Sequence, residues 1–351
     1  MVKRNVPNIK RKRITKINLN NYIYINIMDN LLLIIIFVSI AALIYFMKKP
    51  KPNQIENQPI LDDIDPRVMA QVNNGKINVW TFCQDEDYNF KMNWRYPQLS
   101  YNYRYPFQKL CIDTLLKNMD KHDVNLIIVT RKNAHLYVPD FPSRLKHSGY
   151  QEKKVIDLLG AYLLERYGGL WISPYTVVLD KDYRGLLNDV RNHELVTFGT
   201  SPNITNCDPF NGTFTAVNNK IIGAQRGTTA IMSYKNLLQQ FIFGKQKEYL
   251  YNHVGHDPEP LGEAIHYINP IHKHYCCKSD GSYNMNDRKI HMDAFLGKMP
   301  LQFKDPTSML FVSVPYEELD TDTNYRWILN TPMDELLSSN ISIVEIIKKQ
   351  L

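Results

Sequence analysis

Residues 154–182 read KVIDLLGAYLLERYGGLWISPYTVVLDKD, and this stretch decides the fold. Apolar side chains recur three or four positions apart in its first half, which is the spacing of one face of an α-helix. The paired glycines Gly168 and Gly169 predict a sharp reversal after that helix, because glycine adopts positive φ without steric cost. An apolar strand over residues 170–172 and a turn containing Pro174 follow. The stretch therefore predicts a helix, a reversal and a strand that ends beside polar groups.

Apolar runs and helical patterns alternate on both sides of this stretch. Strands are expected at residues 77–82, 125–130, 177–179, 195–198 and 220–224, and helices at residues 107–119, 229–243, 258–268 and 341–349. Such alternation is typical of an α/β domain whose mainly parallel sheet is flanked by helices on both faces. Ligands of these sheets bind outside the carboxyl ends of the strands. The sequence therefore predicts an α/β domain over residues 75–351 with its functional site at that edge.

The composition indicates a large folded domain and a separate basic tail. The chain of 351 residues is 44% hydrophobic and 11% aromatic, which excludes a disordered or low-complexity protein. Of the net charge of +7, residues 1–30 hold seven cations against one anion, so residues 31–351 carry only +1. Because the cations abut an apolar segment, membrane orientation explains them more simply than phosphate contacts do. No nucleic-acid partner is expected.

Residues 31–47 read LLLIIIFVSIAALIYFM and carry no charge. A helix of this length spans about 25 Å, and the preceding apolar residues can extend it. A buried core helix is the alternative, whereas a cleaved signal peptide fits less well because residues 1–30 precede the segment. The cations before the segment favour a cytosolic N-terminus. We therefore expect a single-pass type II membrane protein with a cytosolic tail at residues 1–30, a signal-anchor at residues 31–47 and a stalk at residues 48–74.

The C-terminal domain is then expected to be lumenal or extracellular, in a membrane of the ER or Golgi type or in a viral membrane. Sequons for N-glycosylation begin at Asn203, Asn211 and Asn340 and are compatible with a glycoprotein. Five cysteines allow up to two disulfides, whose pairing stays open together with the oligomeric state. The abundance of Asn, Ile, Lys and Tyr is typical of an AT-rich genome, which suggests a large DNA virus as the source.

The stretch quoted first resembles the signature of the DXD-sugar and capsular-polysaccharide-synthesis glycosyltransferases. In that pattern a helix carries an aspartate, here Asp157, and runs into Tyr-Gly-Gly, here residues 167–169, and then into an apolar strand with a central aromatic residue. A second similarity is an Asn that precedes a strand within residues 213–227. The resemblance implies the GT-A-like, Rossmann-like fold of the nucleotide-diphospho-sugar transferases, here preceded by one transmembrane helix.

The resemblance also implies a binding site for a nucleotide-sugar donor. It places around the donor Trp80, Asp157, Gly168, Gly169, Trp171, Ser173 and Tyr175. Asp157 would bind the sugar or the ribose, the glycine pair would admit the donor closely, and a tryptophan would stack on it or form the pocket wall. The catalytic residues stay unknown at this level.

The metal site of the family is altered in this chain. Its two carboxylates would fall on Ser173 and Tyr175, so both are replaced by neutral groups. Mn²⁺ and Mg²⁺ prefer carboxylate oxygens, and their usual role is to neutralise the diphosphate that leaves the sugar. The replacement therefore argues against a metal at the usual place.

Two alternatives for that positive charge stay open. Asp180 and Asp182 form a literal Asp-x-Asp after the next apolar run and are the candidate metal ligands, although a solvated loop explains them more simply. Arg166 and Arg226 are cations that would neutralise a diphosphate directly.

Two functions follow from these patterns. The first is a membrane-anchored glycosyltransferase that moves a sugar from a nucleotide-sugar donor to a glycan or glycoprotein acceptor. The alternative is a catalytically degenerate relative that keeps the fold and acts as a membrane-anchored binding or structural protein. We expect an enzyme, and residues 173–182 separate the two interpretations.

Overall fold

The computed structural model describes residues 66–83, 106–142, 152–199, 217–243, 261, 272–275, 280–282, 284–286, 288–315, 318–319 and 324–351. These residues lie within one unit of the chain, Pro59–Leu351. The predicted tail and signal-anchor lie outside the described residues. Among the described helices, none is long and apolar enough to cross a bilayer.

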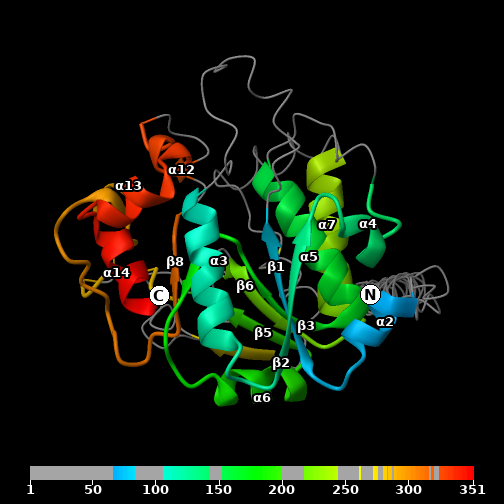
Figure 1. The fold of residues 1–351 in the computed structure, drawn as a ribbon. Helices are drawn as coiled ribbons and strands as arrows, with labels where there is room; N and C mark the ends of the chain where they lie inside the picture. Colours follow the sequence, from blue (N-terminus) through cyan, green and yellow to red (C-terminus); the bar gives the residue numbers. More distant parts are fainter. Residues whose placement is uncertain are drawn as a thin grey trace, which may run out of the picture. The chain divides into compact units, whose positions relative to one another are not determined.

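A six-stranded sheet with the order β2-β1-β3-β6-β5-β7 forms the centre of this unit (Figure 1). Its strands are β1 (Ile77–Cys83), β2 (Val124–Thr130), β3 (Gly169–Ile172), β5 (Leu195–Phe198), β6 (Asn218–Ala224) and β7 (His272–Tyr275). Strands β2, β1 and β3 are parallel, and β5 is parallel to β7. Strand β6 runs antiparallel to both of its neighbours, β3 and β5. The predicted mainly parallel α/β sheet is thereby confirmed, with β6 as its reversed strand.

Helices cover both faces of the sheet (Figure 1). Helices α5 (Glu152–Tyr167) and α7 (Thr229–Phe243) pack on one face, where Trp80 of β1 and Trp171 of β3 belong to their core. Helices α3 (Pro106–Met119) and α6 (Arg184–Asn192) pack on the other face against residues such as Val79. Because both sides of these strands are buried, their sequences are nearly continuously apolar.

A second, smaller layer lies beside α3. It contains a two-stranded antiparallel ribbon of β4 (Thr176–Val178) and β8 (Phe311–Ser313) and the helices α10 (Met292–Leu296), α12 (Trp327–Asn330), α13 (Met333–Ser338) and α14 (Ser342–Gln350). Their apolar side chains form one core with α3. The strand expected at residues 177–179 therefore exists as β4 but leaves the main sheet, because β1 and β6 already occupy both sides of β3.

The folded domain begins earlier than its predicted start at residue 75. Residues Pro66–Val72 form helix α2, whose Val68 and Val72 are buried in the core beneath α5. The Asn78 side-chain amide donates a hydrogen bond to the Val72 carbonyl at 3.1 Å and fixes the helix to β1. The end of the predicted stalk is thus part of the domain, since its apolar residues recur at helical spacing. The short helix α4 (Ala134–Tyr137) was also absent from the sequence prediction.

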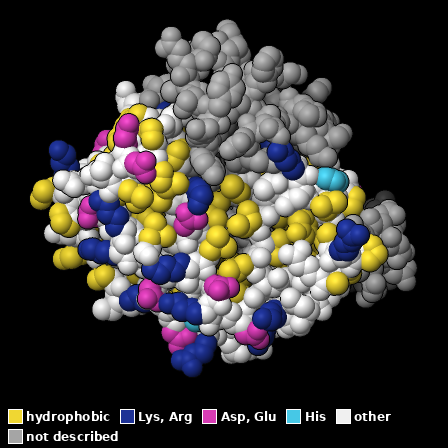
Figure 2. Space-filling view, viewed as in Figure 1, with side chains coloured by type: hydrophobic (Ala, Val, Ile, Leu, Met, Phe, Trp, Pro, Cys, Tyr) yellow, Lys and Arg dark blue, Asp and Glu magenta, His cyan; other side chains and the backbone are white. Residues whose placement is uncertain are grey.

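The surface of the C-terminal layer and α3 carries interspersed charges of both signs (Figure 2). Lys109 pairs with Asp113 at 2.8 Å within α3, and Lys348 pairs with Glu345 at 2.6 Å within α14. Solvent-exposed pairs of this kind add little to stability, so the buried apolar cores account for most of it.

The reversal between α5 and β3 requires both of its glycines. Gly168 and Gly169 have φ angles of +67° and +108°. A Cβ atom added at Gly169 would lie 2.1 Å from the carbonyl oxygen of Asn78 in β1, and one at Gly168 would lie 2.8 Å from the backbone nitrogen of Arg226. Only glycine therefore lets the chain turn from α5 into a strand that pairs with β1.

We predict that Gly169→Ala lowers the free energy of unfolding by about 3 kcal/mol or more, because it combines a positive φ with a backbone overlap. Gly185→Ala is the control, since a Cβ there meets nothing within 4 Å. As Gly185 lies in α6, this control should stabilise by about 0.5–1 kcal/mol. Urea denaturation measures both values, and equal stability of the two variants would contradict the account.

Candidate functional site

One side of the sheet, which we call its carboxyl edge, is formed where β6 begins and where the other five strands end. These strands are β1, β2, β3, β5 and β7. At this edge the pairing of β5 with β6 is irregular. Thr197 pairs with Ile222, whereas Phe198 pairs with Asn218. Residues 219–221 of β6 therefore have no partner in β5 and form an irregular segment of the strand, which we call the bulge. Bulges change the direction of side chains and are common beside functional sites.

A buried carboxylate meets this bulge from α5. The Asn219 side-chain amide donates a hydrogen bond to Asp157 Oδ2 at 3.0 Å, and both residues are only 6% exposed. Helix α5 approaches the sheet closely because Gly160 lies against the Trp171 ring, which a Cβ would meet at 2.7 Å. Since Ile221 pairs with Ile172, the last residue of β3, Asp157 lies beside the carboxyl end of β3. The sequence prediction placed Asp157 near this edge but did not find its partner.

A second buried carboxylate meets the bulge from the C-terminal layer. The Asn218 side-chain amide donates to Asp280 Oδ2 at 2.9 Å and lies 3.4 Å from the Ser313 hydroxyl. Asp280 Oδ1 accepts from the Ser282 backbone at 3.0 Å, and the Asp280 carbonyl accepts from the Ser313 backbone at 2.9 Å. The two carboxylates are thus held by consecutive asparagines, Asn218 and Asn219.

Burial raises the pKa of Asp280 above its ordinary value. The Asn218 amide, the Ser282 backbone and hydroxyl groups and the positive charge of Lys220 lower it only in part. Desolvation is the largest cause because the side chain has no exposed surface. Sequence reasoning missed Asp280, since it follows no apolar run and stands in no recognisable motif.

Lys220 lies in the bulge beside the turn that follows β3. Its ammonium group donates to the Val314 carbonyl at 2.9 Å, and its side chain is largely buried. Its own carbonyl accepts from the Ser173 backbone at 2.7 Å. The Val314 backbone in turn donates to the Tyr175 carbonyl at 3.2 Å. Lys220 therefore connects the bulge, the turn of residues 173–175 and the residue after β8.

Of the two residues at the altered metal position, Ser173 is half-buried at this edge and Tyr175 is buried. The Tyr175 ring is 1% exposed and belongs to the core that β4 and β8 share with α3. The turn thus directs the Tyr175 ring into that core, and its contact with a donor stays a prediction. A neutral hydroxyl and a buried phenol do not fit a Mn²⁺ or Mg²⁺ site.

The tryptophans and the glycine pair that were predicted to contact the donor pack against other parts of the protein, and their contact with a donor stays a prediction. Trp80 and Trp171 are at most 1% exposed and form core beneath α5. The Trp80 indole donates to the Gly168 carbonyl at 2.9 Å and lies 5.4 Å from the Tyr167 ring centroid. The glycine pair lies at the amino end of β3, where its close neighbour is the protein backbone.

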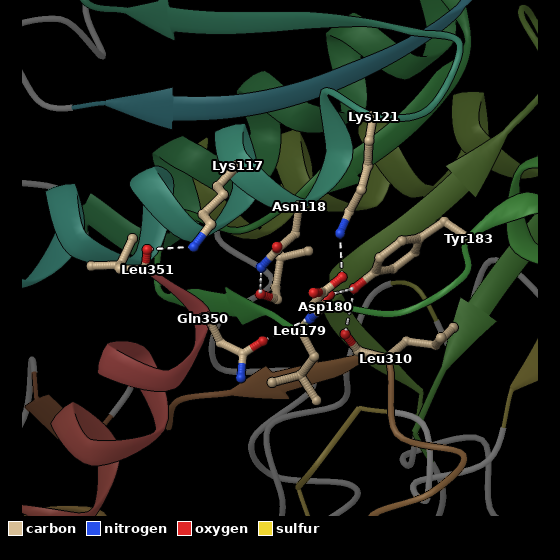
Figure 3. A network of polar contacts seen from close by, with 10 residues as sticks. Lys117, Asn118, Lys121, Leu179, Asp180, Tyr183, Leu310, Gln350 and Leu351 are labelled. Carbon is tan, nitrogen blue, oxygen red and sulfur yellow. Dashed lines mark hydrogen bonds and ion pairs between the residues drawn. The ribbon is translucent and has the colours of Figure 1, made fainter.

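The candidate metal ligands Asp180 and Asp182 lie at the opposite edge of the sheet. Asp180 forms an ion pair with Lys121, which follows α3 shortly before β2 begins, and its backbone donates to Gln350 Oε1 at 2.7 Å (Figure 3). Asp182 pairs with Arg184 at 2.7 Å, and this contact lowers the pKa of Asp182 to about 2. Both carboxylates are exposed and each is paired with a cation, and their role as metal ligands stays a prediction. Within the described ranges, no group of three or more His, Cys, Asp or Glu side chains is arranged for a metal.

The two arginines proposed as phosphate ligands also lie away from the carboxyl edge. Arg166 lies in the last turn of α5 and pairs with Asp140 at 2.7 Å. Arg226 follows β6 at the amino end of β3, where its backbone nitrogen approaches Gly168. The structure thus brings together Asp157 and Ser173 from the sequence prediction and adds Asn218, Asn219, Lys220, Asp280 and Ser313, which we call the edge cluster.

Comparison with known proteins identifies the family that this region resembles. Residues 107–257 match the sequence model of the family described as "Capsular polysaccharide synthesis protein". The predicted resemblance to capsular-polysaccharide-synthesis glycosyltransferases is thereby confirmed, whereas a viral origin has no support. No curated protein matches the chain.

Two solved structures are similar to the chain at low identity. A putative nucleotide-diphospho-sugar transferase from Desulfovibrio desulfuricans G20 has 11% identity and a TM-score of 0.29, and the match covers 57% of this chain and 79% of that one. An active-site mutant of LgtC has 9% identity and a TM-score of 0.34, with 72% of this chain and 94% of that one covered.

We predict that the Asp280 carboxyl makes stability depend on pH. Its raised pKa means that the folded state binds a proton more tightly than the unfolded state does. Its contribution is therefore fully present below the ordinary aspartate pKa of about 4 and is lost as the pH rises through the folded-state value. Asp280→Asn should remove this decrease in the free energy of unfolding with rising pH, as measured by urea denaturation over a pH series. An identical pH slope in Asp180→Asn and Asp280→Asn would contradict the assignment.

Proposed function

We propose that this protein is a glycosyltransferase that takes a sugar from a nucleotide-sugar donor bound at the carboxyl edge of its sheet. The observation that carries the proposal is the buried pair of Asp157 and Asn219 beside the end of β3. Asp157 stands within residues 107–257, the region that matches the capsular polysaccharide synthesis family. Ligands of open α/β sheets bind at this edge.

Asp157 is suited to holding hydroxyl groups of the donor. A carboxylate accepts several hydrogen bonds, and those from sugar or ribose hydroxyls are stronger when the acceptor is charged and shielded from water. The Asn219 amide fixes the orientation of the Asp157 side chain from the sheet side. Such orientation is what a binding group needs before the substrate arrives.

The location of the reaction is part of the proposal. The apolar residues 31–47 would anchor the chain as a single-pass type II membrane protein, with the α/β domain on the lumenal or extracellular side. The acceptor would then be a glycan or a glycoprotein on that side. The uncharged segment and the cations that precede it support this arrangement.

A second function is favoured by the residues at positions 173 and 175. The replacement of both family carboxylates, together with the burial of the Tyr175 ring, agrees with a protein that binds a nucleotide sugar without turning it over. Such a protein would act as a membrane-anchored binding or structural component.

Binding and turnover of donors by the purified full-length chain test the proposal. We expect a panel of UDP- and GDP-sugars to contain one that raises the melting temperature and is hydrolysed or transferred. Asp157→Asn should bind that sugar nucleotide at least about tenfold more weakly, because a hydrogen bond to a charged group contributes about 1.5–3 kcal/mol.

Asp180→Asn is the matched control, since its carboxylate lies at the opposite edge and should leave the affinity within about twofold of wild type. Binding without any hydrolysis or transfer would favour the second function. Failure of the whole panel to bind would contradict both.

A further inference from the structure

The edge cluster must neutralise the negative charge of a bound nucleotide-sugar donor. Its diphosphate carries negative charge, and more charge develops on it as the bond to the sugar breaks. Proteins meet such charge with a metal ion or with cationic side chains. The residues at positions 173 and 175 do not fit a metal, and among the described residues of the site a cationic side chain is the other source of positive charge. This step rests on the proposed function.

We propose that Lys220 neutralises the diphosphate of the donor and that this protein binds nucleoside diphosphates without a divalent cation. Lys220 would be a binding residue for the leaving group, at the place where its family carries a metal between two carboxylates.

The position of Lys220 is the first support. The bulge in β6 contains both Lys220 and Asn219, the partner of Asp157. The Lys220 carbonyl accepts from the Ser173 backbone, so Lys220 lies directly beside the altered metal position. A donor whose sugar or ribose meets Asp157 therefore has its diphosphate within reach of this turn.

The burial of Lys220 is the second support. An ammonium group held away from water carries a large desolvation cost, and an apolar side chain of similar size is often at least as stable. A lysine at a largely buried position is thus poorly explained by stability alone. In a site of low dielectric its charge interacts strongly with an anion.

The neighbouring carboxyl group is the third support. Asp280 faces Lys220, and ionisation of Asp280 would cancel the positive charge. Burial raises the pKa of Asp280, which favours its neutral form. Among the described residues, the other hydrogen-bond partners of Asp280 are the Asn218 amide, Ser282 and the Ser313 backbone, and they carry no charge. A neutral Asp280 therefore leaves the positive charge of Lys220 uncancelled from this side of the bulge.

Other described cations are placed less well for this role. Arg166 is paired with Asp140, and Arg226 lies at the amino end of β3. Arg131 and Lys132 follow β2, which is separated from β3 by β1. Lys220 is next to the turn after β3 itself.

Isothermal titration of the full-length chain with UDP, GDP, uridine and guanosine tests the proposal. We expect the wild type to bind one of the two diphosphates with an affinity that changes less than about twofold between EDTA and Mn²⁺. Lys220→Met should weaken the affinity for that diphosphate at least about tenfold, because one charge-assisted contact is lost. Its affinity for the matching nucleoside should stay within about twofold of the wild-type value. A purely structural role would weaken both ligands alike.

Lys235→Met is the matched control. Lys235 is similarly shielded and pairs with Glu165 at 2.6 Å, but it lies between α5 and α7. This variant should keep both affinities.

The proposal is overturned if Lys220→Met keeps the diphosphate affinity, or if EDTA abolishes diphosphate binding by the wild type. The comparison of wild-type binding in EDTA and Mn²⁺ tests metal-free diphosphate binding even if Lys220→Met does not fold. If the wild type binds the nucleosides and the sugar nucleotides of the panel, but binds the nucleoside diphosphate no more tightly than the nucleoside, this inference alone is overturned. A wild type that binds none of these ligands overturns the proposed function instead.

Discussion

The backbone contact between Gly169 and Asn78 is the constraint on which the rest of this structure depends. A positive φ at two consecutive residues turns the chain from α5 into β3 without a side chain between the strands. Because β3 then pairs closely with β1, α5 is held flat against the sheet with Gly160 on the Trp171 ring. This packing places Asp157 over the carboxyl end of β3. The glycine pair thus positions the site from the opposite end of the strand.

The bulge in β6 gives the edge of the sheet its polar character. In a regular strand, neighbouring side chains alternate between the two faces of the sheet. Residues 219–221 have no partner in β5, and this irregularity allows neighbouring side chains to reach different elements. Asn219 reaches α5, and Asn218 reaches Asp280 in the C-terminal layer. Two carboxyl groups from other elements and the Lys220 ammonium group are therefore buried around this short segment. Buried charges are costly, so their concentration at the ligand-binding edge indicates function more than stability.

Much of the fold followed from the sequence, and less of the site did. Long apolar patterns identified the central strands and the helices α3, α5 and α7, because burial on one or two faces leaves a clear period. Short elements such as α2 and β8 contain too few residues for a sustained pattern and were missed. The Trp-containing strand and the glycine pair were noticed for their resemblance, yet packing gives them structural roles. Asp280 and Lys220 became visible only through contacts between segments far apart in the sequence, which no local pattern encodes.

The central claim is that a nucleotide-sugar donor binds at the bulge of β6 and the turn after β3. Hydrogen–deuterium exchange of the full-length chain, with and without the sugar nucleotide that binds it, tests this location most directly. The account predicts slower exchange at the backbone amides of residues 173, 175, 176 and 218–220, with unchanged exchange at residues 180–184. Protection confined to residues 180–184 and the glycine pair, at the opposite edge of the sheet, would contradict it.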